Sequence, residues 1–209
     1  MASFLSATRP KRSMDLPLFP LKTVLFPGGV LPLKVFEQRY IEMTKACLAN
    51  GVPFGVVLVT EGEEVARAGD APARFAAIGT TASITSWDLP EQGILHIGVA
   101  GGTRFRVVSH ETRADGLVQG RVSLLAVEPT LALPAACAPL ARLLEALALR
   151  AGPQHFPAAR AFDDASWVGY RLAEMLPLPL HIKQTMLEVN DSEIRLSVLQ
   201  KFLRQQGLR

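Results

Sequence analysis

Cysteine is scarce in this sequence. The 209 residues include only Cys47 and Cys137, which do not have the spacing of a metal motif and are too few for a disulfide framework. Cys47 also falls on the apolar stripe of a predicted helix, where a free cysteine behaves as a small buried hydrophobic residue. We therefore expect reduced thiols and a cytoplasmic protein.

The motifs of the common enzyme classes are missing as well. None of the six lysines follows a glycine, so there is no G-x-x-x-x-G-K-[ST] phosphate-binding loop, and no G-x-S-x-G nucleophile elbow occurs. The four histidines are far apart in sequence and form no H-E-x-x-H pair: His96, His110, His155 and His181. We expect no cofactor, no metal and no enzymatic activity.

The sequence also lacks long apolar runs, and residues 15–209 carry no net charge. The uncharged stretch at 130–141 contains two prolines and is too short to cross a bilayer. The formal net charge of +3 has a local origin, because residues 1–14 carry three basic residues and no acidic one, which leaves 19 basic and 19 acidic residues over 15–209. This pattern predicts a disordered tail at 1–14 on a neutral body, and no membrane partner.

Prolines interrupt the apolar segment at 16–43. Proline cannot donate to a β-ladder, so it belongs at strand edges and bends. Phe26-Pro27-Gly28-Gly29 has the composition of a turn between two short strands. Strands are predicted at 16–21, 30–35, 54–59, 75–85, 94–100, 103–108 and 117–127, with a helix at 36–50, a turn at 87–93 and a tight turn or bulge at Gly101-Gly102. Short strands with such corners are typical of a small, mostly antiparallel barrel.

From residue 134 the periodicity becomes helical. Helices are predicted to begin near residues 134, 163, 182 and 190. Asn190, with Glu193 three residues later, resembles a capping box. The apolar stripe of the last helix is predicted to comprise Ile194, Val198, Leu199, Phe202 and Leu203. The sequence therefore predicts an α+β protein, with a barrel subdomain of about six strands and one helix at 15–128 and an α-helical subdomain at 134–209 packed on it.

Three apolar side chains are candidates for binding a polypeptide. Trp87 and Leu89 lie in a predicted turn, and Phe156 lies in a loop flanked by prolines. Exposed aromatic residues can anchor a bound chain. The alternative for each aromatic residue is that it folds back onto its own domain.

Three arginines are candidates for binding nucleic acid. Arg104 and Arg106 alternate with apolar residues along one predicted strand, and Arg121 lies on the next. A stripe of arginines is suited to phosphate contacts. The alternative is a solvated face of the barrel, with the arginines paired to Glu111 or Glu128.

A set of motifs gives the chain a family resemblance. The first block comprises Leu16-Pro17-Leu18-Phe19-Pro20-Leu21, Phe26-Pro27-Gly28, Leu31-Pro32-Leu33 and Phe36-Glu37 with Arg39-Tyr40. Phe54-Gly55-Val56, Ile78-Gly79-Thr80, Gly101 with Arg104-Phe105 and the helical segment 183–188 continue it over most of 15–203. Together these motifs resemble the LON substrate-binding domain, the N-terminal domain of Lon proteases, which also occurs in cereblon and in small stand-alone bacterial proteins.

The resemblance implies a PUA-like pseudo-barrel followed by helices, with a role in recognising protein substrates. It supplies no catalytic residue. Since the sequence contains neither an ATPase module nor a Ser–Lys protease domain, the form that we expect is the stand-alone one.

Three functions remain open at this point. The first is a non-catalytic module that binds unfolded or exposed apolar segments of other proteins. The second is a PUA-like module that binds nucleic acid, and the third is a hydrolase with an unrecognised site. A salt titration separates the first two, because phosphate binding weakens steeply with salt whereas apolar burial does not.

Overall fold

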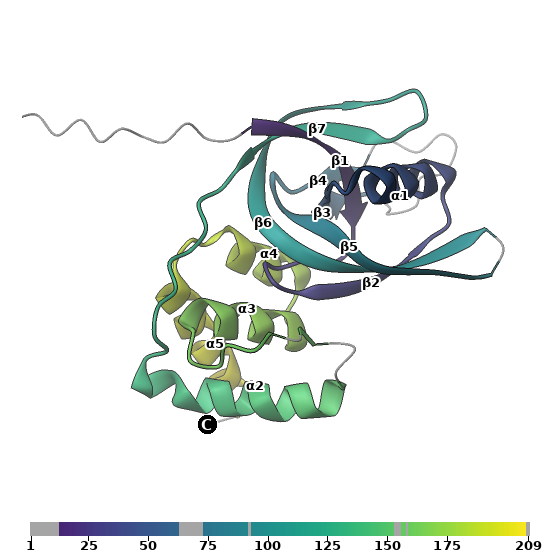
Figure 1. Cartoon of the computed structure of the whole chain (residues 1–209). Helices are drawn as coiled ribbons and strands as arrows, with labels where there is room; N and C mark the ends of the chain where they lie inside the picture. The colour runs from purple at the N-terminus through teal and green to yellow at the C-terminus, as the bar shows by residue number, and fades with distance from the viewer. Residues whose placement is uncertain (1–12, 63–72, 92, 153–155, 158, 208–209) are drawn as a thin grey trace, which may run out of the picture.

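The computed structural model describes residues 13–62, 73–91, 93–152, 156–157 and 159–207 (Figure 1). The strands are β1 (Ser13–Leu21), β2 (Val30–Val35), β3 (Phe54–Glu61), β4 (Arg74–Phe75), β5 (Ile78–Glu91), β6 (Ile94–Thr112) and β7 (Val118–Leu124). The helices are α1 (Gln38–Asn50), the short 3-10 helix η1 (Ala135–Cys137), α2 (Ala138–Ala151), α3 (Ala165–Met175), α4 (Leu180–Glu188) and α5 (Ser192–Gln205). No α-helix in these ranges is long and apolar enough to cross a membrane.

The strands form one sheet that closes on itself. Their order is β1-β7-β6-β5-β3-β4, and β1 also pairs with β3 in parallel, which brings the two sides of the sheet together. All other pairings are antiparallel, including that of β2 with β6. α1 packs against this barrel, and the rings of Phe19 and Tyr40 stack with their centroids 4.0 Å apart. The predicted mostly antiparallel pseudo-barrel is confirmed.

The last four α-helices lie together beside the barrel (Figure 1). Their apolar faces share one cluster of buried residues with the barrel. The barrel contributes Val24, Phe26, Leu58, Ala76 and Ile78 to this cluster. Phe26 lies 5.5 Å from the ring of Tyr170 on α3, measured between centroids. One cluster of buried residues is therefore shared between barrel and helices, whereas two further clusters lie within the barrel and α1.

Two features of the hairpin β5–β6 differ from the prediction. The segment predicted as a turn at 87–93 belongs largely to β5, and the chain reverses only at Gly93, whose φ is 86°. The two strands predicted at 94–100 and 103–108 are a single strand of 19 residues, β6. Gly101 lies inside β6, at an irregularity of the β5–β6 register. The Gly101 amide donates to the carbonyl of Gly29, at 2.8 Å, so this glycine allows a close backbone approach rather than a turn.

The predicted tail and the last helix cap also need correction. Ser13 and Met14 belong to β1 and pair with Ser123 and Val122, so the predicted tail at 1–14 is too long by two residues; residues 1–12 lie outside the described part of the chain. The N-cap of α5 is Asp191, whose side chain accepts from the amide of Ile194. It is not Asn190, which instead accepts a hydrogen bond from Arg104.

The turn before β2 contacts an ion pair of α3 in which the arginine is buried and the glutamate is half-buried. The buried Arg171 guanidinium donates to the carbonyl of Pro27 at 2.9 Å and forms an ion pair with Glu174, also at 2.9 Å. Lys183 of α4 donates to the backbone carbonyl of Glu174. A Cβ atom at Gly29 would lie 1.8 Å from a Glu174 carboxylate oxygen, so a larger residue there would displace this carboxylate. Burial raises the pKa of Glu174 to about 7, and the positive charges of Arg171 and Lys183 only partly oppose this shift.

This raised pKa predicts a pH-dependent stability. Because the folded protein binds a proton on Glu174 more tightly than the unfolded chain does, the stabilisation is complete below about pH 4.5 and is lost as the pH rises through about 7. Relative to Glu174→Gln, the wild type should lose up to about 3 kcal/mol of unfolding free energy between pH 4.5 and pH 8. Urea unfolding at four pH values measures this difference. Glu145→Gln, on the exposed face of α2, is the control. Parallel curves for wild type and Glu174→Gln would contradict the prediction.

Candidate functional site

The β5–β6 hairpin projects from the barrel (Figure 1). An apolar groove runs between this hairpin and α1. Trp87 and Leu89 are two residues apart on β5, and their side chains are 62% and 58% exposed. They line the groove together with Leu48 and Leu95, and its volume is about 740 Å³. We call it the hairpin groove. Two large apolar side chains are therefore presented to solvent by paired strands rather than by a loop.

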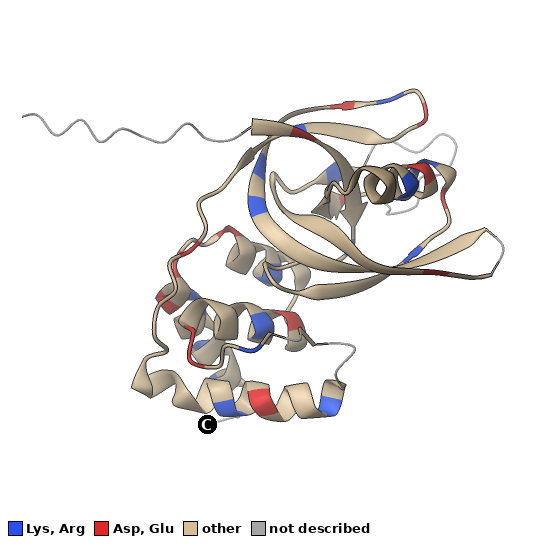
Figure 2. Ribbon diagram, viewed as in Figure 1, with Lys and Arg blue, Asp and Glu red and all other residues tan. Residues whose placement is uncertain are grey.

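The hairpin groove carries little charge. Charged residues are sparse along the hairpin in Figure 2. Among the described residues that line the groove, only Lys45 is charged, and it forms an exposed ion pair with Glu42 at 2.9 Å. Exposed ion pairs contribute little stability. The groove is therefore suited to apolar ligands more than to phosphate.

The third predicted anchor is not on the surface. Phe156 is only 5% exposed, and its ring packs edge-on against Trp167 with the centroids 5.6 Å apart. Arg160 covers it from another side. The interpretation of Phe156 as an exposed binding residue is wrong, because Trp167 of α3 packs against its ring.

The predicted arginine stripe is divided between interior and surface. Arg106 and Arg121 are exposed on β6 and β7, but Arg104 is buried. The guanidinium of Arg104 donates to the carbonyls of Leu187 and Val189. The interpretation of Arg104 as a phosphate-binding residue is wrong, because the α4–α5 connection covers it.

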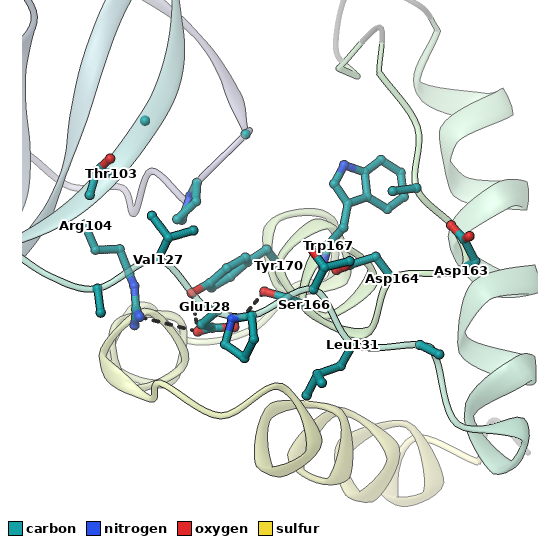
Figure 3. A pocket seen from close by; sticks show the side chains of 18 residues that line it. Thr103, Arg104, Val127, Glu128, Leu131, Asp163, Asp164, Ser166, Trp167 and Tyr170 are labelled. Atoms are coloured by element: carbon teal, nitrogen blue, oxygen red, sulfur yellow. Dashed lines mark hydrogen bonds and ion pairs between the residues drawn. The ribbon is translucent and has the colours of Figure 1, made fainter. Parts of the chain in front are cut away.

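Arg104 belongs to a charged cluster between barrel and helices, which we call the junction network. Its centre is Glu128, which accepts two hydrogen bonds from Arg195 at 2.5 and 3.0 Å. The Glu128 carboxylate also lies 3.5 Å from the Arg104 guanidinium (Figure 3). Tyr170 and Ser166 each donate a hydroxyl hydrogen bond of 2.6 Å to the same carboxylate. Burial raises the pKa of Glu128, but the hydrogen bonds from Arg195, Ser166 and Tyr170 outweigh it and hold the pKa below its usual value.

A second cavity, which we call the junction cleft, lies above this network. Its volume is about 720 Å³. One wall is the extended strap at 125–133, which connects β7 to the helices, and the facing walls come from Gly28, Thr103 and the start of α3 (Figure 3). Trp167, Leu131 and Val127 make its lining partly apolar, and Asp163 adds negative charge. This cleft has both polar and apolar surfaces.

The comparisons with known proteins agree with this architecture. The family model of the ATP-dependent protease La (LON) substrate-binding domain matches residues 15–205. The chain belongs to this family. It therefore carries a substrate-recognition module of the Lon type, and the family's domain is non-catalytic.

Individual relatives contain this LON domain within longer chains. Chicken (Gallus gallus) cereblon is 29% identical over 114 residues, which cover 53% of this chain and 24% of the cereblon. Lon protease 2 of Myxococcus xanthus is 36% identical over 94 residues, which cover 44% of this chain and 11% of that protease. The chain thus spans a quarter or less of the curated relatives that it matches.

Solved structures match nearly the whole LON domain. The Lon N-terminal domain protein from Xanthomonas campestris has a TM-score of 0.73 and 35% identity, covering 90% of this chain and 98% of that one. The N-terminal domain of a Mycobacterium avium complex Lon protease has a TM-score of 0.58 and 18% identity, covering 89% and 96%. At 18% identity, the second match shows a shared fold alone.

The junction network of this LON domain was missed by sequence reasoning. Glu128 was considered only as a surface partner of arginines, and Arg195 and Tyr170 were not considered at all. Glu128 and Arg195 are 67 residues apart, and no local spacing signals such a contact. The one available signal was an arginine within the otherwise apolar pattern of the last helix.

The remaining titratable groups were compared with the ligand sets of metal sites. No group of three or more histidine, cysteine or acidic side chains in the described ranges is arranged to hold a metal ion. Cys47 and Cys137 are free and buried, and burial raises the pKa of both thiols.

Proposed function

We propose that this protein is a non-catalytic module that binds unfolded or exposed apolar segments of other proteins, and that the hairpin groove is its binding surface. The observation that carries the proposal is the pair Trp87 and Leu89, more than half exposed beside an apolar groove. Membership in a substrate-binding family supports it. Two free cysteines support a reducing, cytoplasmic location for this activity.

The physical basis of binding is burial of apolar surface. Tryptophan is enriched among the side chains that dominate binding energy, and grooves of this size accommodate short ligands. An unfolded chain also loses conformational freedom when it binds, which reduces the net affinity. We expect dissociation constants of about 1–100 μM.

Replacing Trp87 should weaken binding of an unfolded protein. With reduced, carboxymethylated α-lactalbumin as the probe, Trp87→Ala should raise the dissociation constant about tenfold or more, because the alanine removes the largest apolar contact of the groove. Leu149→Ala is the matched control, since Leu149 is an exposed apolar residue on α2, away from the groove. Isothermal titration measures both. Equal affinity for native and carboxymethylated α-lactalbumin would refute recognition of unfolded chains, whereas an unchanged Trp87→Ala affinity would refute only the assigned surface.

Binding of nucleic acid is the alternative that the same titrations distinguish. Arg106 and Arg121 remain exposed on neighbouring strands, so binding through them would weaken steeply with added salt. Binding through the hairpin groove should change little between 50 and 300 mM salt. A steep salt dependence that disappears in Arg106→Ala would favour the nucleic-acid function.

A further inference from the structure

The strap at 125–133 has an edge that is paired at both ends and open between them. At its start, the Leu125 amide donates to the carbonyl of Arg104 at 2.8 Å. At its end, the Leu131 carbonyl accepts from the Ala165 amide at 2.9 Å, and the Leu133 amide donates to the carbonyl of Asp163 at 2.7 Å. Among the described residues, nothing pairs with the backbone at 126–130.

The open part of this edge faces the junction cleft. In extended backbone, successive peptide groups point to alternate sides, which places residue 127 on the side where 125, 131 and 133 find partners. Pro129 lies on the same side but has no amide to donate, so Val127 provides the amide donor there. Those partners, on β6 and at the start of α3, are also residues that line or flank the cleft. The amide and carbonyl of Val127 therefore lie on the side of the strap that faces the cleft, and no neighbouring strand among the described residues pairs with them. The side chain of Val127 is 80% exposed, so packing does not explain its position.

The chemistry of the cleft limits what can fill the gap. Val127, Leu131 and Trp167 offer apolar contact. Arg104 and Glu128 already form an ion pair with each other, so their charges are compensated before any ligand binds. Asp163 is exposed and has no cationic partner within the described residues, and Asp164 caps α3. An occupant thus meets an apolar wall, a backbone edge and uncompensated negative charge.

We propose that the junction cleft binds an extended polypeptide segment in which a lysine or arginine lies close to an apolar residue, by adding a short strand to the edge at Val127. Addition of a strand to an exposed edge derives affinity from backbone hydrogen bonds and specificity from alternate side chains. The volume of about 720 Å³ is within the usual range for ligand pockets and suits a short segment. This site is separate from the hairpin groove and does not depend on it.

The test uses the full chain and a fluorescein-labelled octapeptide, GSVKLKSG. Val127→Pro removes the amide that faces the cleft and should weaken binding at least tenfold. Ala126→Pro is the matched control, because its amide points to the other edge of the strap, and it should change affinity less than twofold. The same peptide with its central residues N-methylated should lose binding, and GSVELESG should bind at least fivefold more weakly. Asp163→Asn should reduce the preference for the lysine peptide.

Two results would overturn this proposal. One is binding of the octapeptide that Val127→Pro and backbone N-methylation leave unchanged. The other is binding that Trp87→Ala abolishes, which would place the peptide in the hairpin groove. If Val127→Pro does not fold, the wild-type amide resonance of Val127 decides: it should shift on titration with the octapeptide, and a stationary resonance at saturation refutes the proposal.

Discussion

Replacing Glu128 with alanine should lower the free energy of unfolding by about 3–5 kcal/mol, because it leaves buried arginines without their counter-charge. The side chains of Arg195 and Arg104 are almost completely buried, so water entering from the junction cleft would replace the carboxylate only in part. The hydroxyls of Tyr170 and Ser166 would lose their acceptor as well. Urea unfolding at pH 7 measures the loss.

The control for this experiment is Glu111→Ala, an exposed acidic residue on β6, which should change stability by less than about 0.5 kcal/mol. The pH dependence gives a second test. Because folding lowers the pKa of Glu128, its contribution is present above its usual pKa of about 4.5 and is lost as the pH falls through the folded value. A loss below about 1 kcal/mol for Glu128→Ala at pH 7 would show that the junction network contributes little to holding barrel and helices together.

Removing the helices should prevent the barrel from folding as a stable monomer. We propose that the chain consists of a barrel subdomain at 15–128 and a helical subdomain at 134–209 packed on it, and that the two share one cluster of buried apolar residues. A fragment ending at residue 128 would expose Phe26 and Ile78, which are buried in the cluster shared with the helices. It would also leave Arg104 and Glu128 without their partners from the helices. Exposed apolar patches of this kind cause association.

We therefore expect a fragment comprising residues 13–128 to be aggregated or to unfold without cooperativity. Size-exclusion chromatography and thermal unfolding, compared with the full chain, measure this. A monomeric fragment as stable as the full chain would contradict a shared core and would support two independent domains.

The sequence was sufficient to predict the helices and strands that have a strong local signal. The strand at 30–35 has the bounds that periodicity predicts, and the helix predicted to begin near residue 163 begins at Ala165, with Asp164 as its N-cap. The Gly101-Gly102 pair was less informative, because a turn and a close approach need the same residue type. A Cβ atom at Gly101 would lie 2.1 Å from the carbonyl oxygen of Phe26, a contact that no local pattern reveals.

The buried face of the last helix was predicted incorrectly, because the prediction followed the apolar stripe and a buried arginine changes that face. Ile194 and Val198 were predicted to face the core but are exposed, whereas Arg195 and Leu196 are buried. Glu128 compensates the charge of Arg195 inside the protein, which rotates the buried face of α5 away from the most apolar residues. A partner 67 residues away decides this rotation.

The candidate binding residues were predictable by type but not by environment. Trp87 and Leu89 are exposed because the β5–β6 hairpin extends past the barrel, although the sequence suggested a turn there. Phe156, in a loop with similar signals, is buried by Trp167. Exposure of a loop aromatic depends on which helix packs over the loop, and the sequence does not specify that packing.

The two tryptophans of the chain provide the most direct test of the proposed function. Trp87 lines the hairpin groove and Trp167 lines the junction cleft, so their indole N–H resonances report the two sites separately. On titration of the ¹⁵N-labelled protein with carboxymethylated α-lactalbumin, the Trp87 indole signal should shift or broaden, and native α-lactalbumin should leave it unchanged. A Trp87 signal that stays in place while binding saturates would contradict the hairpin groove as the site of substrate recognition.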